Sequence, residues 1–390
     1  MRALTGVLPL SDAEMTDPGL RPISEAQMRQ FLDAVSRAGE VGGAGGGERP
    51  PSLKGHSIVS LSLRSATIAG GTFDNLHIEE SDFSGATFRF CTFTNVNLEK
   101  PDLDKTHFAN CTFIACTVKG PSTAAAARFT DCTFTSCKIE QLRTPEAVFE
   151  SCAFDKCEIT DMSFKPARWK SVVFKECTLN DCRFFNGEMA GVEFAESMLE
   201  FCAFEGFLGR GIAFNGGALK TSGFTNVTLM GIAFTKATLK SLKFNESDAS
   251  DVAFIECPAI DSLGLIATTM KGVAFKDCPG VEDLTMMKST IRDLVISGTL
   301  LGVGHWIDSD IAGATTFNKV VIESIDLTKS RLVGVVFESC RVDGTLNFES
   351  TIFSRVRLKS ITYADEVKIL DASATYLDSD RFKAPMSLQS

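Results

Sequence analysis

The chain has 390 residues and a formal net charge of −10 at pH 7, from 39 basic and 49 acidic residues. The acidity is spread along the chain, and there is no basic run or patch of the kind that binds nucleic acid. No apolar stretch is long enough to cross a bilayer. We therefore expect no direct contact with nucleic acid and no transmembrane segment.

Residues 1–55 are predicted to form a mobile leader, a short helix and a linker. Ser24 and Gln27 have the spacing of a capping box, which predicts a helix over residues 24–38. The glycine-rich segment 39–51 that follows predicts a flexible tether.

The predicted helix carries one apolar stripe at helical spacing. The stripe consists of Met28, Phe31, Leu32 and Val35. It either covers the open end of the domain that follows or docks on another protein. Because of the second alternative, these four residues are candidate partner contacts.

From residue 58 an apolar residue returns at every fifth position. The uninterrupted run is Ile58, Leu63, Ile68, Phe73, Ile78, Phe83, Phe88, Phe93, Leu98, Leu103, Phe108, Phe113 and Val118. The residue two positions before each of these centres is usually small, and the other three are polar. Five is the period of neither a helix nor a simple strand, so each unit is a short extended segment followed by a corner. Such a short repeat predicts a solenoid.

The centres between Phe154 and Phe254 tend to alternate between Phe and Ile, Leu, Met or Trp. An alternation every ten residues means an even number of sides, and four sides give a coil of twenty residues. Residue i then stacks on residue i+20 one coil later, about 4.8 Å away.

Several segments share a small residue, Asp or Asn, Leu or Phe, and two polar residues. Examples are Ser81-Asp82-Phe83-Ser84-Gly85, Val96-Asn97-Leu98-Glu99-Lys100 and Pro101-Asp102-Leu103-Asp104-Lys105. Residues 56–363 thus resemble the pentapeptide-repeat family. The resemblance implies an all-β fold, a right-handed quadrilateral parallel β-helix. The departures are Phe-rich centres, many Cys residues and frequent loss of the Asp or Asn.

All thirteen cysteines lie two residues before a centre or its predicted register position. This placement favours small buried apolar residues over disulfides. The square of Cys132, Cys137, Cys152 and Cys157 offers a less favoured alternative, a four-thiolate zinc site. So many free thiols indicate a reducing compartment.

The five-residue period is interrupted in three places. Residues 119–128 shift its phase by one, residues 205–211 place Phe207 at a small-residue position, and residues 259–316 contain His305 and Trp306. These interruptions are either neutral drift or local binding surfaces. Phe207, His305 and Trp306 are therefore further candidate partner contacts. Residues 364–390 lose the period and predict a C-terminal cap or tail.

No catalytic, metal or cofactor motif is present, and the sequence predicts a protein that is not an enzyme and needs no cofactor. The leading hypothesis is a scaffold that binds a protein partner. The resemblance also extends to bacterial effectors delivered into host cells. It therefore implies residence in the bacterial cytoplasm before export, secretion into a host cell and a role in virulence.

Two alternatives remain. The first is a DNA mimic that modulates DNA gyrase or another topoisomerase, as some members of the family do. The interspersed lysines, such as Lys236, Lys240 and Lys243, disfavour it. The second is a regulatory β-helix of a larger assembly.

Overall fold

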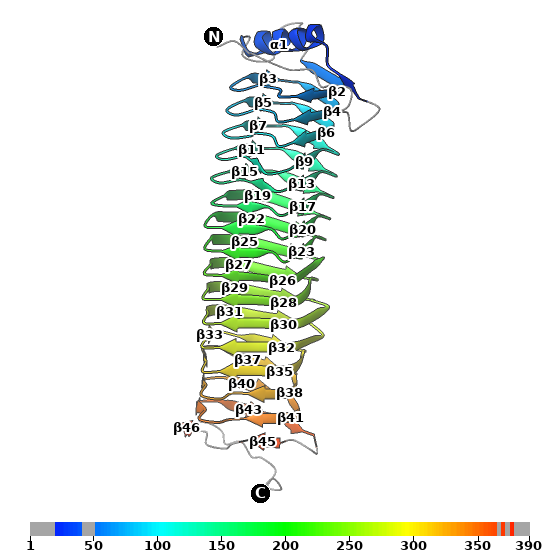
Figure 1. The fold of residues 1–390 in the computed structure, drawn as a ribbon. Coiled ribbons are helices and arrows are strands. Elements are labelled where there is room, and N and C mark those ends of the chain that lie inside the picture. Colours follow the sequence, from blue (N-terminus) through cyan, green and yellow to red (C-terminus); the bar gives the residue numbers. More distant parts are fainter. Residues whose placement is uncertain (1–19, 41–50, 365–367, 371–374, 378–390) are drawn as a thin grey trace. The chain divides into compact units, whose positions relative to one another are not determined.

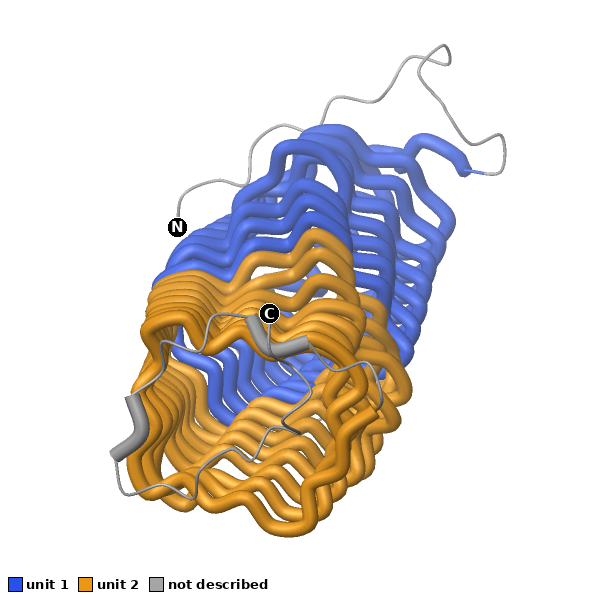
Figure 2. The backbone as a smooth tube through the Cα atoms, turned by 90° about the horizontal axis from the view of Figure 1, so that it is seen from below, with its two compact units in different colours: residues 1–193 blue, residues 194–390 orange. Residues whose placement is uncertain are grey.

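The computed structural model describes residues 20–40, 51–364, 368–370 and 375–377, which form one helix and a ladder of parallel strands. The helix is α1 (Glu25–Glu40) (Figure 1). The chain divides into unit 1, residues 1–193, and unit 2, residues 194–390 (Figure 2). The predicted all-β solenoid with one short helix is confirmed.

Strands of eight residues contain two centres and cross two sides of a coil, whereas most three-residue strands contain one centre. The eight-residue strands are β2 (Ser52–Val59), β4 (Thr72–Glu79), β6 (Thr92–Glu99), β19 (Arg168–Lys175), β22 (Glu188–Ala195), β25 (Leu208–Asn215), β26 (Ala218–Thr225), β27 (Thr228–Thr235), β28 (Thr238–Asn245), β29 (Asp248–Ile255), β30 (Ala259–Ile266), β31 (Thr269–Lys276), β32 (Gly280–Met287) and β35 (Leu300–Ile307).

The remaining strands are shorter. They are β1 (Arg21–Pro22), β3 (Thr67–Ala69), β5 (Thr87–Arg89), β7 (His107–Ala109), β8 (Thr112–Ile114), β9 (Thr117–Lys119), β10 (Ser122–Thr123), β11 (Arg128–Thr130), β12 (Thr133–Thr135), β13 (Lys138–Glu140), β14 (Leu142–Arg143), β15 (Val148–Glu150), β16 (Ala153–Asp155), β17 (Glu158–Thr160), β18 (Ser163–Phe164), β20 (Thr178–Asn180), β21 (Arg183–Phe185), β23 (Met198–Glu200), β24 (Ala203–Glu205), β33 (Thr290–Arg292), β34 (Val295–Ser297), β36 (Asp310–Ala312), β37 (Thr316–Asn318), β38 (Val321–Asp326), β39 (Arg331–Val333), β40 (Val336–Glu338), β41 (Arg341–Asn347), β42 (Ile352–Ser354), β43 (Arg357–Lys359), β44 (Thr362–Tyr363), β45 (Lys368–Leu370) and β46 (Thr375–Leu377).

The parallel register follows the predicted interval. In unit 1, Phe73 pairs with Phe93 and Ile78 with Leu98 across β4 and β6, twenty residues apart. Residues 119–128 add one residue, because Phe108 pairs with Phe129. The predicted shift of phase is thus a coil of twenty-one residues. Each coil places four centres inside, one from each side.

Aromatic centres stack into ladders because the register places identical residues one above another. Phe93 stacks on Phe113 with ring centroids 4.8 Å apart, and Phe134 stacks on Phe154 at 4.5 Å. In unit 2, Phe214 and Phe234 stack at 5.0 Å. Offset stacking of buried rings adds to the free energy of apolar burial.

Corners between sides use left-handed backbone two residues after a centre. Asn75 and Asn95 have a φ of 51°, and Asp131 a φ of 50°. Asn and Asp adopt this conformation more readily than other residues with a side chain. Their frequency at this position of the repeat therefore has a backbone cause.

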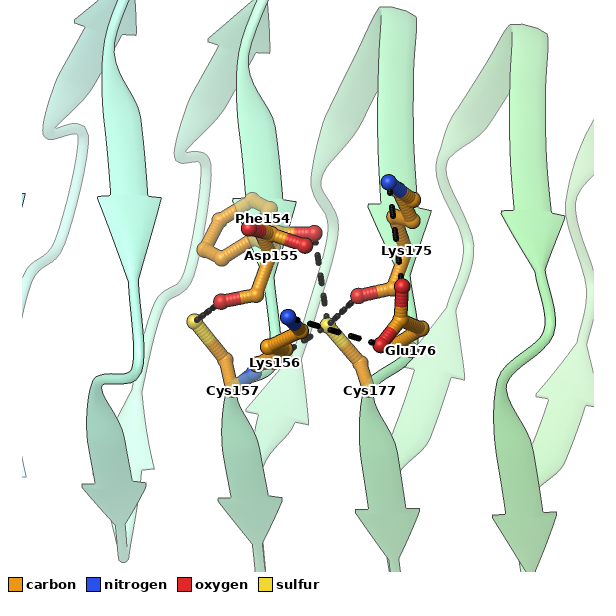
Figure 3. A network of polar contacts seen from close by, with 7 residues as sticks. All are labelled: Phe154, Asp155, Lys156, Cys157, Lys175, Glu176 and Cys177. Carbon is orange, nitrogen blue, oxygen red and sulfur yellow. Dashed lines mark hydrogen bonds and ion pairs between the residues drawn. The ribbon is translucent and has the colours of Figure 1, made fainter.

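All thirteen cysteines are buried and free. Figure 3 shows one pair, in which the Cys177 thiol donates to the carbonyls of Phe154 at 3.3 Å and Lys175 at 3.4 Å. Cys157 likewise donates to Asp155 O at 3.5 Å. Burial raises the pKa of the Cys340 thiol, where no second thiol contributes to the shift. The cysteines occupy small inward positions.

The N-terminal end contains two strands in addition to the helix predicted for residues 1–55. β1 pairs with β2 through Arg21 and His56, and β2 begins at Ser52, before the predicted boundary at residue 56. Leu53 extends the five-residue period backwards and is buried. β1 covers part of the exposed edge of β2, which would otherwise present unpaired backbone groups. Residues 1–19 and 41–50 lie outside the described residues.

The C-terminal end also departs from the prediction, which ended the β-helix at residue 363. The ladder continues through β45 and β46, where Leu346 pairs with Ile369 and Phe353 with Tyr376. The paired residues are twenty-three positions apart, which is not a multiple of five, so the five-residue period did not predict these strands. Residues 378–390 lie outside the described residues.

Candidate functional site

The apolar stripe of α1 faces the first coil rather than solvent. The predicted capping box forms, because Ser24 N donates to Gln27 Oε1 at 3.1 Å and Gln27 N donates to Ser24 Oγ at 3.3 Å. Phe31 meets Phe73 edge to face with ring centroids 5.9 Å apart. Among the stripe residues, Met28, Phe31 and Val35 are buried and Leu32 is half-buried.

Of the two alternatives for the stripe, the structure favours the cap. Three of the four candidate contact residues are covered by their own chain, so in this arrangement a partner meets at most Leu32. The physical reason is the open end of the β-helix, where Phe73 would otherwise lose its apolar cover.

Phe207 lies in the core and does not form a surface contact. Gly209 stands at the centre position, and a Cβ there would lie 2.9 Å from Phe207 Cε2 and 2.6 Å from Leu229 Cδ2. The interruption at residues 205–211 is thus an exchange of volume, in which a large residue at the small position fills space left by a glycine.

Trp306 and His305 have opposite orientations in β35. Trp306 is completely buried, and its Nε1 donates to Leu284 O at 3.1 Å. Gly304 makes room for the indole, because a Cβ there would lie 3.2 Å from Trp306 Nε1. His305 is exposed. Of this pair, the described surface presents only the histidine to a partner.

The exposed histidine belongs to an unusual surface of unit 2 formed by β30, β32, β35 and β38. We call it the apolar–acidic surface. Its partly exposed apolar residues are Ile266, Met287, Leu300, Val303, Ile307 and Val321. Its acidic residues are Asp261, Glu282, Asp283, Glu323 and Asp326. The four strands contain no Lys or Arg.

The apolar side chains of this surface are arranged in columns by the register. Met287 pairs with both Ile266 and Ile307 in the neighbouring coils, and Leu300 pairs with Val321. Leu300 is 40% exposed, and Met287 and Val303 are each 37% exposed. Apolar residues that line up over neighbouring coils are typical of an interaction surface, whereas scattered ones are not.

The surface continues through a corner of the coil. Ser262, Asp283 and Val303 pair in register through the middle of β30, β32 and β35. In β28 the corner residue Ser241 has a left-handed φ of 58°. β30, β32 and β35 have no left-handed residue at the equivalent position, and their register continues through this corner.

The carboxylates differ in what they contact. Asp283 accepts hydrogen bonds from Thr285 Oγ1 at 2.9 Å and Ser262 Oγ at 3.3 Å, and Asp261 lies 3.8 Å from Lys240 Nζ. Glu282 and Glu323 are exposed and form no ion pair with any described residue. They lie one coil to either side of Gly302. Two carboxylates thus remain available to a cation.

The described residues contain no group of three or more His, Cys, Asp or Glu residues placed to hold a metal ion. Nor does any described helix have the length and apolar character needed to span a membrane.

Part of this site was accessible from the sequence. The interrupted segment 259–316 contains β30, β32 and β35 of this surface but not β38. At Trp306 the interruption reflects a change in the core and not a surface contact. The six apolar residues were missed because they occupy outward positions that are spread over several five-residue repeats. Writing the sequence in rows of twenty or twenty-one residues would have shown the columns and the absence of Lys and Arg.

Profiles of known protein families match the five-residue repeat of this chain. A profile described as "Pentapeptide repeat region" matches residues 106–184 and 177–254, and one described as "Pentapeptide repeats (8 copies)" matches residues 62–99. A search of curated proteins found no match.

Among solved structures, similarity is found to HetL from the cyanobacterium Nostoc sp., described as involved in heterocyst differentiation regulation. It has 12% identity and a TM-score of 0.30, over 58% of this chain and 86% of HetL. Full-length QnrB1, a plasmid-mediated fluoroquinolone resistance protein, has 15% identity and a TM-score of 0.28, over 56% of this chain and 93% of its own.

A third similar structure is the catalytic unit of an α-1,3-glucanase from Streptomyces thermodiastaticus. It has 8% identity and a TM-score of 0.29, over 93% of this chain and 69% of the glucanase. At these values the structural similarities transfer no function. The repeat profiles match residues 62–99 and 106–254, and together with the coil of about twenty residues they support a pentapeptide-repeat β-helix.

Proposed function

We propose that this protein is a non-enzymatic scaffold that binds a protein partner through the apolar–acidic surface of unit 2. The partner segment combines Lys or Arg with apolar side chains. The observation that carries the proposal is the composition of four neighbouring strands, which present six partly exposed apolar residues and five carboxylates and contain no Lys or Arg.

Complementary charge supports this choice of partner. Glu282 and Glu323 have no basic partner among the described residues, and a Lys or Arg of another protein could form ion pairs with them. Charge complementarity of this kind raises association rates and suppresses wrong partners. The columns around Met287 and Leu300 would contribute apolar burial.

A selection from a displayed peptide library tests the proposal without a known partner. The full chain serves as bait, and a variant with Leu300→Ser and Val303→Ser serves for counter-selection. We expect enriched peptides that carry Lys or Arg beside Leu, Ile, Phe or Trp and that bind more weakly as salt rises. Enrichment of acidic peptides, or of peptides that bind both baits equally, would contradict the proposal.

A matched control uses exposed apolar residues of unit 2 that lie on other strands. Leu208 in β25 and Met230 in β27 are 52% and 53% exposed. A bait with Leu208→Ser and Met230→Ser should retain the enriched peptides with unchanged affinity. Loss of binding in this variant would point to general surface stickiness instead.

The finer form of this proposal is a bacterial effector that is delivered into a host cell. Its support is the predicted arrangement of leader, helix and tether, of which residues 1–19 and 41–50 lie outside the described residues. A translocation reporter on the full chain, compared with a variant lacking residues 1–19, tests it. Absence of reporter signal from the full chain in host cells would argue against delivery.

DNA mimicry has weaker support. Carboxylates of unit 1 pair with bases of neighbouring coils, as Asp74 does with Lys54 at 2.6 Å and Glu176 with Lys156 at 3.7 Å. Such pairing interrupts the dense negative charge that a duplex presents. Inhibition of gyrase supercoiling by the purified full chain would restore this alternative.

A further inference from the structure

Unit 1 contains an internal cavity of about 70 Å³ that extends along the interior of several coils. Its wall is made of aromatic and aliphatic side chains between Phe93 and Phe174, together with two cysteines. Val96, Val118 and Ile139 line it from one side of the coil. The cavity is distinct from the apolar–acidic surface, which lies entirely in unit 2.

The cavity offers nothing to hold a water molecule. Its two thiols are already engaged, because Cys116 donates to Phe93 O at 3.3 Å and Cys137 donates to Phe113 O at 3.5 Å. The buried side-chain oxygens without a partner in the described residues belong to Ser81, Asn97, Asp155 and Asp310, none of which lines the cavity. An internal water needs two to four polar partners, so this cavity stays dry.

Its size fits a small apolar occupant. An empty apolar cavity of about 150 Å³ binds benzene or xenon, whereas one water needs about 10–15 Å³ of cavity volume. At about 70 Å³ the cavity lies between these volumes. We propose that it is a binding site for a small apolar molecule, of the size of a rare-gas atom or a short alkane.

The chemistry of the wall supports binding by dispersion. Stacked rings such as Phe113 and Phe134, 4.6 Å apart, and the sulfur atoms of Cys116 and Cys137 are polarisable groups. An atom that fills the void regains contacts that its lining has lost, and no hydrogen bond is sacrificed.

Xenon is the probe for a first test, on the full chain with labelled Ile, Leu and Val methyl groups. We expect saturable shifts with xenon pressure at the methyls of Val96, Val118 and Ile139. Unit 2 supplies an internal size control, a cavity of about 30 Å³ lined by Ile322 and Val342, whose methyls should not show saturable shifts. Shifts that rise linearly and equally throughout the chain would overturn the proposal.

A filling variant gives the second test. Ile139→Phe should weaken xenon binding at least about tenfold, and the smaller change Val118→Leu should weaken it less. The matched control is Ile260→Phe, a buried centre of unit 2 that does not line the cavity, and it should leave binding unchanged. Unchanged affinity in folded Ile139→Phe would contradict this location. If Ile139→Phe does not fold, Val118→Leu and the wild-type titration decide the question.

Discussion

The two units use the same register to build different surfaces. In unit 1, bases meet acids across neighbouring coils: Lys138 lies 3.5 Å from Glu158, and Lys100 lies 3.8 Å from both Glu79 and Glu80. In β30, β32, β35 and β38 of unit 2 the bases are missing and apolar residues take outward positions. Each residue stacks on the residue about twenty positions later. A few substitutions spaced by one coil therefore change the chemistry of one whole side of the β-helix.

The interiors differ in a related way. Both units contain ladders of one residue type, such as Phe93, Phe113, Phe134 and Phe154 in unit 1 and Phe214, Phe234, Phe254 and Phe275 in unit 2, but unit 2 adds exchanges of volume. In unit 2, Gly209 with Phe207 and Gly304 with Trp306 exchange volume between inward positions. In each pair a large buried side chain occupies space that a glycine leaves open, so the core stays filled although the positions differ.

The largest expected effect is on the ladder of unit 1. Phe134→Ala removes a ring stacked at 4.6 Å on Phe113 and at 4.5 Å on Phe154. It should lower the free energy of unfolding by about 3–5 kcal/mol, measured by denaturant titration. Phe90 is 65% exposed, and Phe90→Ala should cost less than about 0.5 kcal/mol. Equal costs for the two variants would refute the assigned register.

The volume exchange in unit 2 predicts a compensating pair. Gly304→Val places atoms against Trp306 Nε1 and Ile325 Cγ1, which lie 3.2 and 3.1 Å from the position that a Cβ of residue 304 would take, and should cost about 1–3 kcal/mol. With Trp306→Leu the double variant should be more stable than the sum of the single effects predicts. Strict additivity in thermal unfolding would show that the two positions do not share space.

Charge reversal should separate the surfaces of the units. Glu282→Lys with Glu323→Lys should weaken binding of a basic, apolar peptide about tenfold, or about 1.4 kcal/mol. Glu79→Lys with Glu99→Lys is the control pair in unit 1, because it reverses the charge of two carboxylates that pair in register in neighbouring coils. This unit 1 variant should bind the peptide with unchanged affinity in fluorescence titrations. A comparable loss of affinity in this variant would show that net charge, and not the apolar–acidic surface, determines binding.

The smallest expected effect concerns pH. Burial raises the pKa of the Cys340 thiol above its usual value of 9.0. The unfolded chain loses this proton near pH 9 while the folded chain keeps it, so the stabilising effect is complete below pH 9 and is lost as pH rises through the higher folded pKa. Above pH 9 the wild type should therefore lose stability faster than Cys340→Ala. Parallel pH curves would show that the thiol is not protected.

The sequence predicted the repeat, the four-sided coil and the buried cysteines because each depends on one inward residue per unit. It predicted the helix from Ser24, Gln27 and the apolar stripe. It did not predict β1, β45 or β46, since backbone pairing there does not follow a five-residue period. Trp306 was predicted to be a partner contact but lies in the core. Gly304 leaves the space that the indole fills, and a five-residue pattern in the sequence does not show such space. The apolar–acidic surface was not predicted, because its residues become neighbours only when positions about twenty residues apart are aligned.

Photo-crosslinking from one position on each unit tests the central claim most directly. A photoreactive phenylalanine analogue replaces Val303 on the apolar–acidic surface or Phe90 in unit 1, and each protein is irradiated with the same displayed peptide library. The account predicts crosslinked peptides rich in Lys, Arg and apolar residues from position 303, and few from position 90. Equal yields of the same peptides from both positions would contradict it.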